Sequence, residues 1–152
     1  VYGSAEVVGL MCLQAFLVGT KHSAEEKSRM VAGARALGAA FQKVNFLRDL
    51  SADANKLGRS YFPGIVPEEL TEEQKHELVA DIDSDLKVSA AAMPLLPKEA
   101  RRAVAAAHML FEQLNQRIGN TPASKVITTR ISVPKQTKAL ILLQASIGVL
   151  PK

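Results

Sequence analysis

The chain has 152 residues, of which 47% are apolar and 22% are charged, a composition typical of one globular domain rather than of a disordered or fibrous segment. The formal charge of +4 comes from Lys and Arg residues spread along the sequence with few aromatics between them, so we expect no nucleic-acid binding. Cys12 is the single cysteine, which excludes an internal disulfide framework; we expect it to be a small buried apolar residue.

We expect neither a signal peptide nor a membrane-spanning segment. No apolar run reaches the roughly 20 residues that a membrane-spanning helix needs, and the first residues do not have the pattern of a signal peptide. We therefore expect a cytoplasmic location, with which a peripheral contact with a membrane is compatible. Because the sequence opens inside an apolar run and without an initiating Met, we expect a fragment of a longer chain.

Two helices are predicted in the first third of the chain. The segment 2–18 is apolar on nearly all sides, which predicts a helix buried on all faces. Ser23 and Glu26 have the spacing of a capping box, and a proline-free helical segment follows from 24 to about 56. Gly58 and Pro63 indicate the loop that ends it.

The rest of the chain also reads as helical. Thr71 and Gln74 form a second capping box before a helix that runs to about residue 92, where Met93 and Pro94 interrupt it. Further helices are expected from 97 to about 118, from 123 over a short stretch, and from 135 onward. No segment alternates as a strand would, so we predict an all-α bundle of about five to six helices that forms one unit over 1–152.

A stripe of small and polar residues runs along the long second helix. Successive side chains rotate by about 100°, which places the stripe within an arc of roughly 100°. Its members, in chain order, are Ala34, Gly38, Gln42, Asn45, Asp49 and Asp53. An ordinary core stripe would carry Leu and Ile. The small residues leave room beside the helix, and the amides and acids supply polar groups at one end of that room.

The two acids of this stripe are candidates for metal binding. Asp49 and Asp53 are four residues apart, so both carboxylates project the same way, and a cation would offset their repulsion. Mg²⁺ suits such a pair, and the neighbouring Arg48 and Arg59 suit a diphosphate. The alternative is a solvated face on which the acids pair with Arg48 and Lys56.

A second pair of acids has the same spacing without the stripe. Asp81 and Asp85 belong to an acidic amphipathic stretch, which is most simply a solvated face. A calcium loop is excluded there, because Leu86 and Ala92 stand where Gly and Glu are required.

The segment from Leu37 to Pro63 resembles the second signature of the squalene and phytoene synthase family, which reads LGxAxQxxNxxRDxxxD and then GRxYxP. The opening residues, from Tyr2 to Met11, resemble the family's first signature, and bacterial phytoene synthases are the most similar subgroup. The resemblance covers essentially the whole chain but only the C-terminal half of a family member. The N-terminal half of the same protein is therefore an expected partner.

This resemblance implies the all-α prenyl-synthase fold and a head-to-head condensation of two prenyl diphosphates. The reaction it favours converts geranylgeranyl diphosphate to phytoene through a cyclopropyl diphosphate, as in carotenoid biosynthesis. One alternative is a squalene or dehydrosqualene synthase acting on farnesyl diphosphate, and another is a non-catalytic helical interaction module. The implied cofactor is Mg²⁺, with Mn²⁺ as the alternative ion. No organic cofactor is implied for phytoene, and NADPH only for a squalene synthase.

Roles for individual residues follow from the same resemblance. It implies that Asp49 and Asp53 bind the metal and that Arg48 acts with them in catalysis. It implies contacts with the substrate, diphosphate included, for Gln42, Asn45, Arg59, Tyr61, Arg130 and Lys138. It implies a prenyl channel lined by Ala5, Val8, Gly9, Ala34, Leu37, Gly38 and Phe41.

The sequence also departs from the family pattern. The first aspartate motif is absent, so we expect this polypeptide by itself not to turn over. Ala52 stands where the family often has an acid, and Phe111 where it often has a Tyr, which removes a hydroxyl. Glu6 lies in the first apolar helix and is either a buried acid paired with a base or part of the site.

Overall fold

The computed structural model describes residues 3–53 and 69–151, with only the backbone described for 51–53. Over these residues every regular element is a helix, which confirms the all-α prediction. The elements are α1 (Ser4–Phe16), α2 (Ala24–Asp53), α3 (Glu72–Ala92), the 3₁₀ helix η2 (Met93–Leu95), α4 (Lys98–Gly119), α5 (Ala123–Val126) and α6 (Lys135–Ser146). The predicted continuation of the second helix to residue 56 lies outside the described residues.

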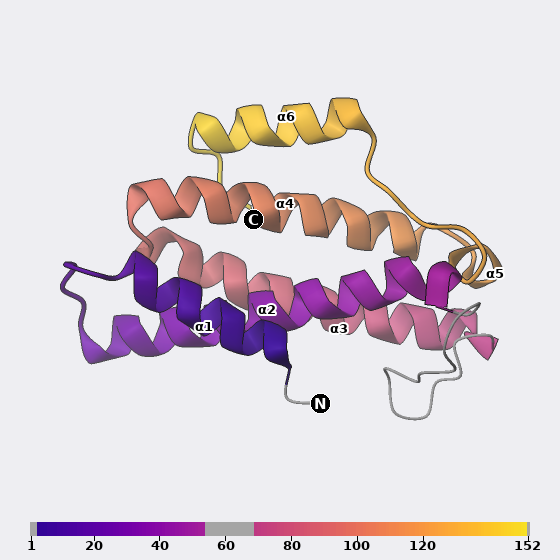
Figure 1. Ribbon diagram of the computed structural model, residues 1–152, viewed down its shortest axis with the longest axis horizontal. Helices are drawn as coiled ribbons and strands as arrows, with labels where there is room; N and C mark the ends of the chain where they lie inside the picture. The colour runs from indigo at the N-terminus through magenta and orange to yellow at the C-terminus, as the bar shows by residue number, and fades with distance from the viewer. Residues whose placement is uncertain (1–2, 54–68, 152) are drawn as a thin grey trace.

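The long helices lie roughly alongside one another, with α2 between α1 and α3 and with α6 along α4 on the far side from α2 (Figure 1). Two hydrophobic clusters fill the space between them. One joins the C-terminal part of α2 to α3, α4 and α5, and includes Val44, Leu47 and Ile82. The other joins α1 to the N-terminal part of α2, η2, α4 and α6, and includes Met30 and Met93. The helices therefore bury their apolar faces mainly against α2 and α4.

Both predicted capping boxes are confirmed. The Ser23 N–H donates to Glu26 at 2.8 Å while the Glu26 N–H donates to the Ser23 hydroxyl at 3.1 Å. The bonds between Thr71 and Gln74 follow the same pattern at 3.0 and 3.2 Å. Hydrogen bonding by the Ser23 N–H lowers the pKa of Glu26 below its ordinary value. These local bonds fix where α2 and α3 begin.

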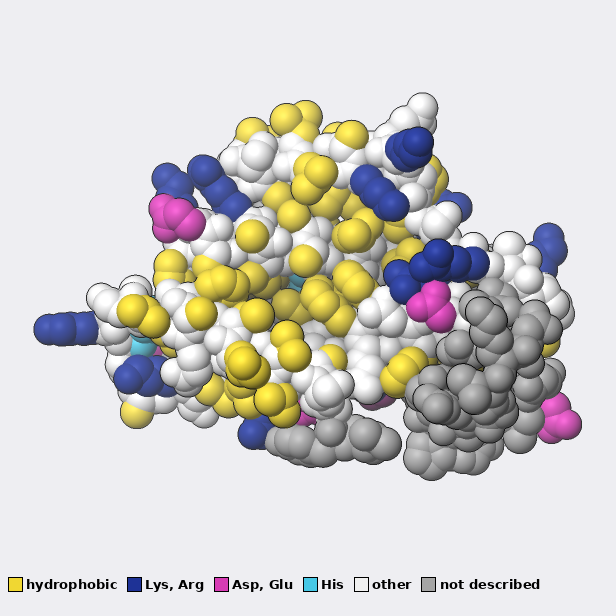
Figure 2. Space-filling model, viewed as in Figure 1, with side chains coloured by type: hydrophobic (Ala, Val, Ile, Leu, Met, Phe, Trp, Pro, Cys, Tyr) yellow, Lys and Arg dark blue, Asp and Glu magenta, His cyan; other side chains and the backbone are white. Residues whose placement is uncertain are grey.

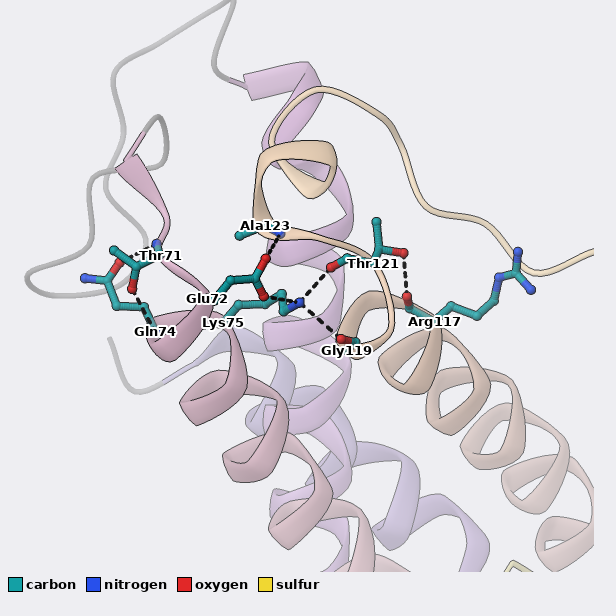
Figure 3. A network of polar contacts seen from close by, with 8 residues as sticks. All are labelled: Thr71, Glu72, Gln74, Lys75, Arg117, Gly119, Thr121 and Ala123. Atoms are coloured by element: carbon teal, nitrogen blue, oxygen red, sulfur yellow. Dashed lines mark hydrogen bonds and ion pairs between the residues drawn. The ribbon is translucent and has the colours of Figure 1, made fainter.

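A buried lysine ties three helix ends together (Figure 3). Lys75 is 2% exposed, and its ammonium donates to the carbonyls of Gly119 at 3.1 Å and Thr121 at 2.7 Å. It also pairs with Glu72 at 2.7 Å, and the other carboxylate oxygen of Glu72 accepts the Ala123 N–H at 2.6 Å. The ammonium thus satisfies carbonyls at the end of α4 and holds the start of α5 to the start of α3.

The prediction that the first helix is buried on all faces is wrong. Leu13 is the buried residue of α1, whereas Val7, Val8 and Met11 are 47%, 55% and 66% exposed. Cys12 is exposed too, so its prediction as a buried apolar residue is also wrong. The physical reason is that α1 packs chiefly against α2, which covers one face of the helix.

The interpretation of Asp81 and Asp85 as a solvated face is also wrong in part. The Lys43 ammonium on α2 donates to Asp81 at 2.5 Å and to Asp85 at 2.8 Å, and the Asp85 side chain is only 24% exposed. Partial burial acts to lower the pKa of Lys43, but the hydrogen bonds to the two aspartates raise it overall. The two acids therefore join α3 to α2.

Replacing Lys75 tests the network at the helix ends. In Lys75→Met the carbonyls of Gly119 and Thr121 lose their donor in a buried place, so the free energy of unfolding should fall by about 2–4 kcal/mol. Urea denaturation followed by circular dichroism measures the change. Lys87→Met, an exposed lysine on the same helix, is the control and should change it by less than about 0.5 kcal/mol. Equal effects of the two substitutions would contradict the role given to Lys75.

Candidate active site

Two glycines allow the backbones of α1 and α2 to touch. A Cβ atom on Gly38 would collide with the carbonyl oxygen of Ala5, and one on Gly9 would collide with the carbonyl oxygen of Ala34. Any larger residue would have to push the helices apart. Each helix therefore contributes one glycine to the crossing, and the crossing holds α1 against the small-residue half of the stripe on α2.

An apolar cavity of about 580 Å³ lies beside this crossing, between α1, α2, α3 and α4. All seven residues expected to line a prenyl channel line it: Ala5, Val8, Gly9, Ala34, Leu37, Gly38 and Phe41. Lining residues that the sequence did not predict lie on α1 and α2, for example Cys12 and Met30, and above all on walls from α3, η2, α4 and the turn between the last two, with Ser89, Ala92, Met93, Leu96, Val104 and Ala107. The alanines of α3 and α4 are the signal that could have indicated these walls, since small residues leave room between helices. The cavity has the size of a typical small-ligand site.

The amides of the stripe follow the cavity along α2. Phe41 lines the cavity and stacks on Phe111 of α4, with ring centroids 3.9 Å apart and an interplanar angle of 20°. Gln42, the first amide of the stripe, packs closely on Gly3. A Cβ atom on Gly3 would collide with the amide oxygen of Gln42. The amide oxygen of Asn45 is buried without a hydrogen-bond partner among the described residues. An unpaired buried acceptor is costly, so this oxygen is a place where a ligand would be stabilising.

Two arginines hold the first acid of the stripe. Arg48 forms a two-point contact with Asp49, from Nε at 3.0 Å and from Nη2 at 2.7 Å. Arg130, which follows α5, approaches the same carboxylate at 3.3 Å, so the structure brings this residue to the acidic end of the stripe. The hydrogen bonds from Arg48 hold the pKa of Asp49 below its ordinary value despite partial burial, and the charges of both arginines act in the same direction. The pairing with Arg48 is the one that the solvated-face alternative also predicted.

The described residues place only some of the predicted site residues at this end of the stripe. Arg59, Tyr61 and the carboxylate of Asp53 lie outside what the structure describes. Lys138 is exposed on α6, and within the described ranges no ion pair joins it to an acid. Glu6 is half-buried, and it too forms no ion pair with the residues described.

A second cavity, of about 420 Å³, lies next to Arg130. Polar side chains and apolar surface both line it, and the polar residues include Arg117, Thr121, Thr129 and Ser132 beside Arg130. Neither Arg117 nor the hydroxyl residues were predicted from the sequence. Two guanidinium groups and several hydroxyls are groups that hydrogen-bond phosphate oxygens, so this cavity extends the polar end of the site.

The oxygen atoms at the Asp49 end of the stripe are suitable ligands for a hard divalent cation, but they are too few to complete its coordination. The carboxylate of Asp49 and the unpartnered amide oxygen of Asn45 project from α2 one turn apart, and oxygen donors are what Mg²⁺ prefers. Over the described ranges, however, no group of three or more Asp, Glu, His or Cys side chains comes together. These residues would therefore hold a cation that completes its coordination with water and phosphate oxygens.

Replacing Arg48 tests the electrostatics of this end. In Arg48→Gln the pKa of Asp49 should rise toward its ordinary value of 3.8, because the main cause of its depression is gone. A carboxylate with a depressed pKa stabilises the folded chain at pH values above its unfolded pKa, and this stabilisation is lost as the pH falls through the folded pKa. A carbon-13 NMR titration of the Asp49 carboxyl group measures the shift.

The control for that titration is Arg102→Gln, which removes an exposed arginine of α4 and should leave the titration of Asp49 unchanged. If Asp49 titrates at the same pH with and without Arg48, the assigned cause of the depression is incorrect.

The chain was compared with family models, curated proteins and solved structures. Residues 1–137 match the family model described as squalene/phytoene synthase. No curated protein and no solved structure gives a significant match. The matched residues contain α1 to α5 whole, and with them the apolar cavity, Asn45, Asp49 and Arg130, whereas most of α6 lies beyond the match.

Proposed function

Because this chain belongs to the squalene/phytoene synthase family, whose reaction is head-to-head prenyl transfer, we propose that it binds geranylgeranyl diphosphate and serves its condensation to phytoene. The observation that carries the proposal is the continuity of one helix stripe. Its small residues, Ala34 and Gly38, line an apolar cavity. Its polar members follow along the helix, and Asp49 among them pairs with two arginines. A ligand with an apolar tail and a doubly phosphorylated head matches this order.

The distance over which the cavity extends along α2 favours a twenty-carbon tail over a fifteen-carbon tail. A helix rises about 1.5 Å per residue. An extended geranylgeranyl chain, at about 5 Å for each isoprene unit, is about 20 Å long and a farnesyl chain about 15 Å. Laid along α2 from Asn45, the longer tail ends between Ala34 and Met30, both of which line the cavity, and the shorter tail ends near Ala34. The longer tail would therefore fill the cavity as far as Met30, which supports phytoene over squalene or dehydrosqualene as the product.

The charged residues at the polar end suit loss of the diphosphate. When the bond between the allylic carbon and the diphosphate oxygen breaks, the electron pair leaves with the oxygen, and negative charge grows on the leaving group. Arg48 and Arg130 supply positive charge at that place, which lowers the barrier if they are already oriented. A bound Mg²⁺ would neutralise diphosphate charge in the same region. The apolar walls would keep water from the allylic cation.

Binding of a non-reactive analogue tests this function directly. We expect geranylgeranyl thiodiphosphate to bind the chain saturably when Mg²⁺ is present and to bind at least ten times more weakly in EDTA, as measured by isothermal titration calorimetry. Asp49→Asn should weaken binding by at least ten-fold and remove most of its Mg²⁺ dependence, because a carboxylate ligand is lost. Mn²⁺ should replace Mg²⁺ in the wild-type chain.

Asp81→Asn is the matched control, since Asp81 is an aspartate of the same spacing pattern that pairs with Lys43 away from the stripe. It should bind the analogue as the wild-type chain does. Binding that is unaffected by EDTA and by Asp49→Asn would exclude the proposed metal and diphosphate site and would favour a non-catalytic interaction module.

Filling the far part of the cavity should change the preference for tail length. Met30→Phe adds three heavy atoms to the cavity wall at the end that only the longer tail reaches. We expect roughly ten-fold weaker binding of geranylgeranyl thiodiphosphate and a smaller change for farnesyl thiodiphosphate. Ala32→Leu, an exposed position on the same helix, is the control and should change neither affinity. An equal loss for both tails would count against this placement of the substrate.

A further inference from the structure

A basic cavity adjoins the acidic end of the stripe. It is the cavity of about 420 Å³ beside Arg130, and its second arginine, Arg117, comes from the last turn of α4; we call it the arginine cavity. Among the described residues, none of the side chains that line it is acidic. Lys or Arg side chains meet an acidic side chain to the right of the apolar centre of this face of the molecule (Figure 2). A cavity lined by charges of one sign concentrates ions of the opposite sign, so the arginine cavity favours an anion.

Arg117 has no anionic partner in the described part of the chain. The residues four before and four after it, Gln113 and Thr121, are uncharged, and no ion pair joins Arg117 to a described acid. All 15 Asp and Glu residues lie at or before Glu112, so the segment 113–152 brings none to the cavity. The positive charge of Arg117 is therefore available to a ligand.

The backbone that carries Arg117 is held in place by hydrogen bonds. The Thr121 hydroxyl donates to the Arg117 carbonyl at 2.7 Å, and the buried ammonium of Lys75 donates to the Thr121 carbonyl at 2.7 Å. The Arg117 side chain itself is directed away from Lys75 (Figure 3). This wall of the cavity is thus fixed before a ligand arrives, which lowers the entropic cost of binding.

Arg130 connects the arginine cavity with the Asp49 end of the stripe. Its Nε atom lies 3.3 Å from the Asp49 carboxylate, and the same side chain, 65% exposed, lines the cavity. A guanidinium group carries five N–H donors, so one contact with a carboxylate does not exhaust them. An anion set free beside Asp49 would therefore meet Arg130 first and, in the same cavity, Arg117.

We propose that the arginine cavity binds inorganic diphosphate as the reaction releases it. This role rests on the proposed function, in which two prenyl diphosphates become one hydrocarbon and each turnover sets two diphosphate ions free. The first ion has to leave while the intermediate still carries the second diphosphate, and the two repel one another. Guanidinium groups bind phosphate oxygens through paired hydrogen bonds, and the volume of the cavity is within the range of small-ligand sites.

Binding of inorganic diphosphate in EDTA tests the proposal, because the Asp49 site is expected to need a metal ion. Isothermal titration calorimetry should show saturable binding, and Arg117→Gln should weaken it by roughly ten-fold or more, as the loss of a charge-assisted contact predicts. Asp49→Asn should strengthen it by roughly three-fold or more, since Arg130 then loses its carboxylate partner. Arg102→Gln removes an exposed arginine about 22 Å away along α4 and, as the control, should change nothing.

Geranylgeranyl thiodiphosphate separates the released ion from the head group of the substrate. With Mg²⁺ present, Arg117→Gln should bind this analogue as the wild-type chain does. The proposal is overturned if diphosphate does not bind in EDTA, or if Arg102→Gln weakens its binding as much as Arg117→Gln. It is also overturned if the analogue binds in EDTA as tightly as diphosphate and through Arg117, since the cavity would then hold the substrate.

The two arms of the experiment distinguish this proposal from the proposed function. Normal binding of the analogue with Mg²⁺, together with any of the overturning results, leaves the proposed function in place and excludes the release site. A chain that binds diphosphate through Arg117 but never binds the analogue contradicts the proposed function, and the release role with it. A role of Arg117 only in stabilising the end of α4 would change the stability of the chain and leave its affinity for diphosphate unaltered.

Discussion

The contact between the backbones of α1 and α2 is the constraint on which the site depends. Gly9 faces a carbonyl of α2 and Gly38 faces a carbonyl of α1, so the crossing is closed from both sides. Large side chains at these positions would separate the helices and fill the space that lies beside them. The same small residues therefore do two things: they let one helix lie on another, and they leave room next to the crossing. The polar members of the stripe are then presented at the end of that room.

The features that the sequence predicted correctly are those with a local physical cause. Ser23 with Glu26 and Thr71 with Gln74 place two helix starts, because each cap satisfies backbone groups within four residues. The stripe on α2 follows from the rotation of a helix, so the sequence indicated that Ala34 and Gly38 share a face. The structure shows that this face lines a cavity. The roles of its residues in prenyl transfer stay predictions.

What the sequence did not indicate depends on contacts between distant segments. Nothing local shows that Lys43 would bind two acids of α3, or that α1 would be covered on one side only. The sequence of α1 shows that its side chains are apolar, but it does not show which neighbouring helices cover them. The walls from α3, η2 and α4 were missed for the same reason, because a cavity is a property of several helices at once. Arg130 comes to Asp49 through the path of the chain after α5.

The buried ammonium of Lys75 has a consequence beyond the helix ends that it joins. It holds the carbonyls of Gly119 and Thr121, while its partner Glu72 holds the first amide of α5, so the segment that follows departs from a fixed origin. Arg130 is carried on that segment and ends against Asp49. The contacts of Lys75 and Glu72 thus fix the start of the segment whose later part carries the guanidinium group of Arg130. Lys75, on α3, thereby helps to set where the second guanidinium group meets Asp49 of α2.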